Sequence, residues 1–228
     1  MTEWKHDKEL FELIDQELFS CVIGDVMDHL DHRHQYLPPN IRPLFDGMKV
    51  IGRAMTVQEA DCAGTRIDHQ DRESAFGVMF EALDSLQPGE IYVCSGSSNP
   101  YACWGELMST RAMHCGGVGA VIEGYSRDTH GIEKLKFPTF SFGPYGQDQG
   151  VRGRVIDYRC PLEFSNGVLV NSGDLLVGDV DGVVAVPQHI EAEVIKLALQ
   201  KVRDENMVAI KIREGMPTRE VWDTYGVM

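Results

Sequence analysis

The sequence has few basic residues, which bind nucleic acid, and no long apolar run, which could span a membrane. Lysine and arginine number 21 against 35 aspartates and glutamates, which gives a formal net charge of −14. Nucleic acids and anionic membrane surfaces repel an acidic protein, so we expect neither as a partner. No apolar run approaches the roughly 18 residues that a membrane-spanning helix needs.

Closely spaced cysteines are also missing. The six cysteines form no CxxC and no other short metal-binding spacing: Cys21, Cys62, Cys94, Cys103, Cys115 and Cys160. The charged N-terminus MTEWKHDKEL has no apolar signal segment, so reduced thiols and a cytoplasmic protein are expected. His29, His32 and His34 lie close together, but without supporting cysteines a surface loop is a better interpretation than a metal site.

What the sequence does contain is typical of one α/β domain with a helical tail. Apolar residues make up 43% of its 228 residues, enough for a substantial core. The hydrophobic pattern predicts N-terminal helices within 8–30, a core over 48–187 and a helical tail over 188–228. We expect Ser20 to cap the second N-terminal helix, and Trp222 to pack against the chain in the tail. Residues 59–74 read as a polar loop.

The central stretch Gly105–Asp128 reads GELMSTRAMHCGGVGAVIEGYSRD. A short helix is predicted for 107–114, ended by Gly116-Gly117, because glycine adopts the left-handed conformation of a helix C-terminus. The apolar, β-branched run 118–122 predicts a buried parallel strand. Arg127 and Asp128 follow in a turn just past the carboxyl end of that strand, where ligands bind in open α/β sheets.

Glu106, twenty intervening residues and then Arg127-Asp128 resemble the acid-X20-Arg-Asp signature of the class II pyruvate aldolases typified by 4-hydroxy-4-methyl-2-oxoglutarate aldolase. The segments CVIGDVMDHL, VIGRAMTV, PGEIYV and SGDLLVGDVDGVVAVP resemble the same family. The family shares its fold with the regulator of ribonuclease E activity A (RraA) proteins. The resemblance therefore implies a single α/β, RraA-like swivelling β/β/α layered domain with a C-terminal helix, assembled as a homotrimer or hexamer.

The residue types in this stretch suit the recognition of a 2-oxo acid beside a hard cation. A carboxylate such as Asp128 can hold Mg²⁺ or Mn²⁺ together with several waters. The guanidinium of Arg127 is a planar fork that matches a carboxylate or an enolate oxygen. Backbone amides of Leu107 and Met108, after Gly105 at a helix N-terminus, could cradle the substrate carboxylate.

The resemblance implies that Asp128 is the direct protein ligand of the metal and that Glu106 holds metal-bound water. Glutamate is one methylene longer than the usual aspartate, so direct binding by Glu106 stays open. A metal- or carboxylate-held water near Glu106 is expected to be the base, in preference to His114 or His130. The simplest alternative is that Arg127 and Asp128 form a surface ion pair and that Glu106 only favours the helix dipole.

Two further family features lack a clear counterpart. Family members commonly place an acidic residue three positions after the aspartate of the Arg-Asp pair, where this chain has Gly131, with Glu133 two residues later. An acidic residue from the C-terminal helix of a neighbouring subunit also assists in the family, and Glu205 is the nearest match.

The function that the resemblance implies is that of a divalent-metal-dependent lyase. It would cleave a 4-hydroxy-2-oxo acid to pyruvate by a retro-aldol reaction through a metal-stabilised pyruvate enolate, and decarboxylate oxaloacetate through the same enolate. The alternative is a non-catalytic RraA-like regulator that binds another protein. Retention of the acid-X20-Arg-Asp set favours the enzyme, because a docking protein has no need of it.

Overall fold

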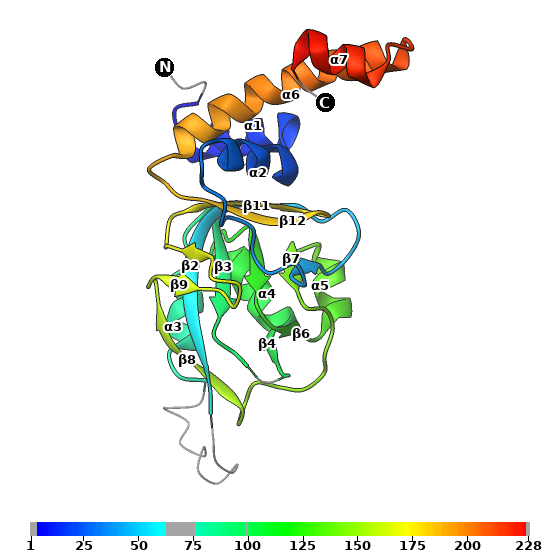
Figure 1. Ribbon diagram of the computed structural model, residues 1–228. Coiled ribbons are helices and arrows are strands. Elements are labelled where there is room, and N and C mark those ends of the chain that lie inside the picture. The colour runs from blue at the N-terminus through cyan, green and yellow to red at the C-terminus, as the bar shows by residue number, and fades with distance from the viewer. Residues whose placement is uncertain (1–3, 63–75, 99, 227–228) are drawn as a thin grey trace.

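The computed structural model of the protein describes residues 4–62, 76–98 and 100–226 (Figure 1). A mixed eight-stranded sheet forms the centre, in the order β1-β7-β5-β3-β2-β11-β12, with β8 paired to β2. The pairings β2–β3, β3–β5 and β5–β7 are parallel and the others in this sheet are antiparallel. Its strands are β1 (Arg42–Pro43), β2 (Val50–Asp61), β3 (Glu90–Ser95), β5 (Gly119–Ile122), β7 (Thr139–Ser141), β8 (Gly153–Tyr158), β11 (Leu175–Asp179) and β12 (Gly182–Val186).

Two pairs of short strands lie outside this sheet. One is the antiparallel pair β9 (Leu162–Glu163) and β10 (Leu169–Val170). The other is the parallel pair β4 (Ala102–Trp104) and β6 (Tyr125–Ser126). Within the central sheet, successive side chains point to opposite faces, so Ala54 and Met55 on β2 enter two different apolar clusters.

Helices cover the sheet in two groups (Figure 1). The first group packs on β11 and β12 and contains α1 (Asp7–Glu17), α2 (Ser20–His29) and α6 (Glu191–Arg213), with α7 (Thr218–Tyr225) following α6. The second group packs against β2, β3 and β5 and contains α3 (Met79–Asp84), α4 (Glu106–His114) and α5 (Thr129–Leu135). Among the described residues, no helix is both long enough and apolar enough to cross a membrane.

Ser20 does not cap the second helix. Phe19 occupies the N-cap position, and Ser20 is the first residue of α2. The buried carboxylate of Asp179 accepts hydrogen bonds from both the backbone amide and the hydroxyl of Ser20, each at 2.7 Å. The side chain that accepts a hydrogen bond at the N-terminus of α2 is therefore Asp179 of the distant strand β11, and not Ser20 as the sequence predicted.

Two other local expectations need correction. In α7 the buried residue is Val221, and Trp222 is 53% exposed, so the predicted packing of Trp222 against the chain is wrong. Strand β2 continues to Asp61, which places its last residues inside the segment predicted to be a loop over 59–74. The remainder of that loop, from residue 63, lies outside the described residues.

Candidate functional site

Strands β4 and β6 bring the two halves of the acid-X20-Arg-Asp signature together. They pair in parallel, with Ala102 opposite Tyr125 and Trp104 opposite Ser126. The amide of Arg127 then donates to the carbonyl oxygen of Trp104 at 2.9 Å. Helix α4 begins just after β4, and Arg127 and Asp128 come just after β6, so this pair of strands holds Glu106 beside the Arg-Asp pair. Neither strand was predicted from the sequence pattern.

The N-terminus of α4 opens directly onto the Arg-Asp pair. Gly105 is its N-cap, and the first intrahelical bond runs from the Ser109 amide to the Gly105 carbonyl, at 3.0 Å. The amides that precede Ser109 in the helix have no intrahelical acceptor and are suited to an anion. A Cβ on Gly105 would lie 3.2 Å from Oδ2 of Asp128, so the absence of a side chain leaves room for that carboxylate.

Asp128 has a left-handed backbone conformation, with φ of 53°, and is the N-cap of α5. Such a conformation is uncommon outside glycine, although aspartate tolerates it better than most residues, and it is found often at functional sites. Its carboxylate Oδ2 lies 3.4 Å from Nε of Arg127. The same guanidinium binds Oδ1 of Asp148 through Nη1 at 2.8 Å, so Arg127 lies between two carboxylates.

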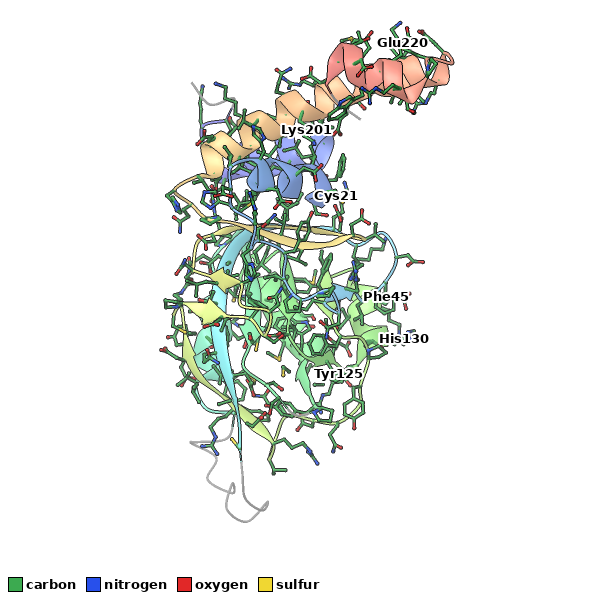
Figure 2. All side chains as sticks on the ribbon, in the orientation of Figure 1. Cys21, Phe45, Tyr125, His130, Lys201 and Glu220 are labelled. Atoms are coloured by element: carbon green, nitrogen blue, oxygen red, sulfur yellow. The ribbon has the colours of Figure 1, made fainter. Side chains whose placement is uncertain are left out.

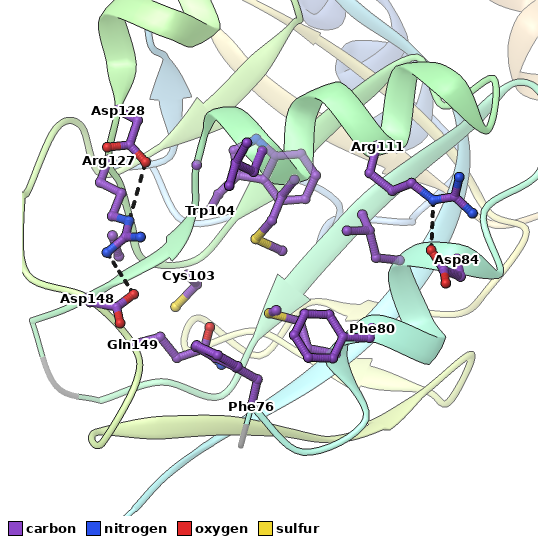
Figure 3. A pocket seen from close by; sticks show the side chains of 16 residues that line it. Phe76, Phe80, Asp84, Cys103, Trp104, Arg111, Arg127, Asp128, Asp148 and Gln149 are labelled. Atoms are coloured by element: carbon purple, nitrogen blue, oxygen red, sulfur yellow. Dashed lines mark hydrogen bonds and ion pairs between the residues drawn. The ribbon is translucent and has the colours of Figure 1, made fainter. Parts of the chain in front are cut away.

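Five of the predicted site residues line one cavity of about 530 Å³: Gly105, Leu107, Met108, Arg127 and Asp128 (Figure 3). Their shared cavity means that the helix amides, the guanidinium and the carboxylate face a common space. A surface ion pair with no further role would not need that arrangement. The side chains of Arg127 and Asp128 are partly exposed, at 39% and 50%, and are therefore open to a ligand.

Glu106 is not among the described residues that line this cavity. Its side chain lies against α5, at the position that departs from the family pattern. A Cβ on Gly131 would lie 2.2 Å from Cδ of Glu106 and 2.3 Å from Oε2. The longer acid at 106 and the missing side chain at 131 are thus accommodated together, because the carboxylate of Glu106 fills the space of a side chain at 131.

The other candidate acids and bases are less closely tied to the cavity. His130 lies on α5, exposed, 3.9 Å from Glu133, and His114 is the last residue of α4. Glu205 pairs with Lys201 at 3.3 Å on α6, which Figure 2 shows at the opposite end of the molecule from Tyr125 and His130. Glu205 therefore does not reach this cavity within one chain, and its role across a subunit interface stays a prediction.

Asp148, Gln149 and the buried Glu59 behind them were not predicted from the sequence. The Gly-rich segment that carries Asp148 has no motif of its own, and its position depends on a hydrogen bond from the Ala102 amide to the Gln147 carbonyl, at 2.7 Å. Gln149 lines the cavity and donates from Nε2 to Oε1 of Glu59 at 2.8 Å. Burial raises the pKa of Glu59 to about 8, and its Oε2 has no hydrogen-bond partner among the described residues.

The carboxylates at this site suit a hard divalent cation that keeps most of its water. In the described part of the chain, no cluster of three or more His, Cys, Asp or Glu side chains could hold a metal. Mg²⁺ and Mn²⁺ need only one or two carboxylates besides water and substrate. The half-exposed carboxylate of Asp128, in the space that Gly105 leaves open, meets that requirement.

Two curated relatives align with most of the chain. A protein from Halalkalibacterium halodurans named "Putative 4-hydroxy-4-methyl-2-oxoglutarate aldolase" is 29% identical over 187 residues, covering 80% of this chain and 79% of that protein. Protein DlpA of Legionella pneumophila is 26% identical over 214 residues, covering 92% of this chain and 33% of DlpA. The chain therefore spans only about a third of the length of DlpA.

Among solved structures, RraAS2 of Streptomyces coelicolor is similar throughout. It is described as an unusual member of the RNase ES inhibitor RraA protein family, and it superposes with a TM-score of 0.76 at 26% identity, covering 91% of this chain and all of that one. The expected RraA-like swivelling α/β fold with a C-terminal helix is thereby confirmed. Residues 20–185 also match the family model RraA-like, described as Aldolase/RraA, and the chain belongs to the RraA-like family.

Proposed function

We propose that this protein is a cytoplasmic, divalent-metal-dependent lyase that cleaves a 4-hydroxy-2-oxo acid to pyruvate and decarboxylates oxaloacetate. The observation that carries the proposal is the cavity shared by Arg127, Asp128 and the N-terminus of α4. These groups together match a 2-oxo acid headgroup, which is small, planar and anionic. The similarity to the Halalkalibacterium protein supports the same assignment.

Substrate binding is assigned to positive groups at the two sides of the headgroup. The amides of Leu107 and Met108 receive the carboxylate at the positive end of the α4 dipole. The guanidinium of Arg127 receives the keto oxygen, and Asp148, 2.8 Å from Nη1, keeps its plane oriented. Because both groups are held by backbone pairing of β4 and β6, little reorganisation is needed when substrate binds.

Asp128 would hold Mg²⁺ or Mn²⁺, with Glu106 holding a water beside it. When bound, the cation supplies Lewis-acid polarisation of the keto oxygen. Glu106 contacts Gly131 and does not line the cavity, so we assign it an indirect role through that water.

During cleavage, the water held by Glu106 takes the proton of the 4-hydroxyl group. The C3–C4 bond then breaks, its electron pair forms the enolate of pyruvate, and C4 leaves as the carbonyl carbon of the second product. Negative charge develops on the former keto oxygen, where Arg127 stabilises it by a hydrogen bond that strengthens in the transition state. The carboxylate of Glu106 takes up the 4-hydroxyl proton through the water, and the return of that proton by the same path to C3 completes pyruvate. Oxaloacetate reaches the same enolate by losing CO₂.

We further propose that the protein acts as a homotrimer or a dimer of trimers. The experiment that tests the activity is a coupled pyruvate-release assay with several 4-hydroxy-2-oxo acids and oxaloacetate, with and without Mg²⁺ or Mn²⁺. Metal-dependent pyruvate release is expected. Absence of release from every substrate would reject the lyase and favour the second candidate, a protein-binding regulator, which the similarity to RraAS2 supports.

A further inference from the structure

The cavity has two ends of different chemical character (Figure 3). Arg127, Asp128 and Asp148 lie at one end. The other end is formed by α3, by Phe76 just ahead of it, and by the side of α4 that faces α3. Its apolar lining residues are Phe76, Met79, Phe80, Leu83 and Met108. The headgroup assigned above occupies only the first end, which leaves the second end to the rest of the substrate.

The apolar end is not simply a surface of the packed core. Met79 and Leu83 are almost fully buried, and Phe76 packs edge-on against Phe80, with ring centroids 5.8 Å apart. Phe80 nevertheless stays 53% exposed while lining the cavity. A ligand that covers this ring would remove apolar area from water, which is the main source of affinity in pockets of this kind.

Charge at the apolar end is already compensated. Among the described residues that line this end, the charged side chains are those of Arg111 and Asp84, and Nε of Arg111 binds Oδ1 of Asp84 at 2.7 Å. A second carboxylate on the substrate would meet the anion of Asp84 as well as the cation of Arg111. That carboxylate would also lose its hydrating water beside an apolar wall, and Arg111, already paired with Asp84, would not fully compensate the cost.

We propose that the cavity selects 4-hydroxy-2-oxo acids whose C4 substituent is a bulky apolar group, aryl or branched alkyl, in place of a second carboxylate. The proposal rests on the proposed function, because the 2-oxo acid headgroup at Arg127 sets the direction of the substrate. The leaving product is then an apolar aldehyde or ketone. Burial of one phenyl ring at this end should favour such a substrate by about tenfold or more in kcat/KM.

Binding of analogues that cannot be cleaved tests the preference without catalysis. Neither 4-phenyl-2-oxobutanoate nor 2-oxoglutarate has a 4-hydroxyl group, and they share one headgroup. In isothermal titration calorimetry with Mg²⁺ present, the phenyl compound should bind at least about tenfold more tightly. Equal or tighter binding of 2-oxoglutarate would overturn the proposal, as would strong 2-oxoglutarate binding that Arg111→Ala removes. If neither analogue binds, the headgroup assignment itself fails.

Two substitutions of Phe80 tie the preference to this wall. Phe80→Asp places a charge beside the substituent, whereas Phe80→Leu keeps the wall apolar, and both occur at a half-exposed position that the fold tolerates. The ratio of kcat/KM for 4-hydroxy-4-phenyl-2-oxobutanoate to that for oxaloacetate should fall about tenfold in Phe80→Asp and stay near wild type in Phe80→Leu. An unchanged ratio in Phe80→Asp would reject the subsite. Because the ratio compares two substrates on the same protein, this conclusion holds even if light scattering shows that the substitution altered assembly. If the wild-type protein does not turn over oxaloacetate, the proposed lyase activity itself is rejected.

Discussion

The carboxylate of Glu106 occupies the space that a side chain at residue 131 would need. A Cβ on Gly131 would lie 2.2 Å from Cδ of Glu106, closer than real Cβ contacts come. The absence of a side chain at Gly131 therefore provides the room that the carboxylate of Glu106 occupies. This contact also makes the two positions energetically dependent on each other, because residues in contact do not contribute independently.

Gly131→Ala should therefore separate stability from activity. Alanine in α5 favours the helix by up to about 1 kcal/mol over glycine, and the displaced end of Glu106 is flexible, so the melting temperature should not fall. Displacement of Glu106 should lower kcat/KM by roughly 10- to 100-fold. Full activity of Gly131→Ala would show that the position of Glu106 is unimportant.

Glu106→Asp should be tolerated, because the shorter side chain restores the usual family residue. Combined with Gly131→Ala, it should recover part of the activity that Gly131→Ala alone loses, since aspartate leaves more room at position 131. Pyruvate release measured across the four proteins of this cycle gives the coupling. Strictly additive losses would contradict the steric explanation.

Substitutions of Arg127 and of Asp128 should lower the activity for different reasons. Arg127→Lys keeps the charge but loses the fork, and kcat/KM should fall by roughly 10²-fold or more. Asp128→Ala should abolish both metal affinity and turnover, and Asp128→Asn is the control for backbone conformation, because asparagine also tolerates a positive φ. Circular dichroism should show all three folded. Near-wild-type oxaloacetate decarboxylation by Asp128→Ala would mean that the site lies elsewhere.

Chelation should abolish the activity reversibly. EDTA is expected to stop pyruvate release, and either Mg²⁺ or Mn²⁺ should restore it, because a site of one or two carboxylates without soft ligands accepts both ions. The measurement is initial rate against free metal concentration. Full turnover in excess chelator would exclude the proposed role of Asp128.

Glu59 should make the protein less stable as the pH rises. Burial raises its pKa from 4.5 to about 8, so between these values the unfolded chain releases a proton that the folded protein retains. The contribution of Glu59 to stability is thus lost as pH increases from about 4.5 to about 8. Glu59→Gln removes this dependence. Its gain in melting temperature over wild type should be near zero at pH 4.5 and several degrees at pH 8.

The exposed Glu163→Gln is the matched control for that comparison. At pH 8 its difference in melting temperature from wild type should be smaller than that of Glu59→Gln. A difference for Glu59→Gln that does not change with pH would show that Glu59 is not held as the neutral acid.

Assembly should be visible at micromolar concentration. Helices α6 and α7 expose the apolar side chains of Met207, Ile210 and Trp222, about half of each being accessible. Light scattering should give the mass of a trimer or a hexamer. A monomeric mass would rule out the proposed oligomer and any role of Glu205 in a neighbouring subunit.

The order and type of most elements were determined by local sequence. Helix α4 ends where Gly116 adopts φ of 86°, and strand β5 matches the predicted apolar run to within one residue. Both depend on interactions between near neighbours in the chain, namely the helix cap and the apolar pattern. The family signature was equally local, because it is a matter of spacing alone.

Tertiary structure decided how those parts meet. The pairing of β4 with β6, the approach of Asp148 to Arg127 and the bond from Ser20 to Asp179 join residues about 20 to 160 positions apart. Such contacts depend on the closure of long loops and on a shared core, which no local pattern specifies. The sequence by itself thus determined which residues carry the acid-X20-Arg-Asp signature. The folded chain alone placed Glu106 against Gly131 and built the apolar end of the cavity, because both require side chains from separate elements to share one volume.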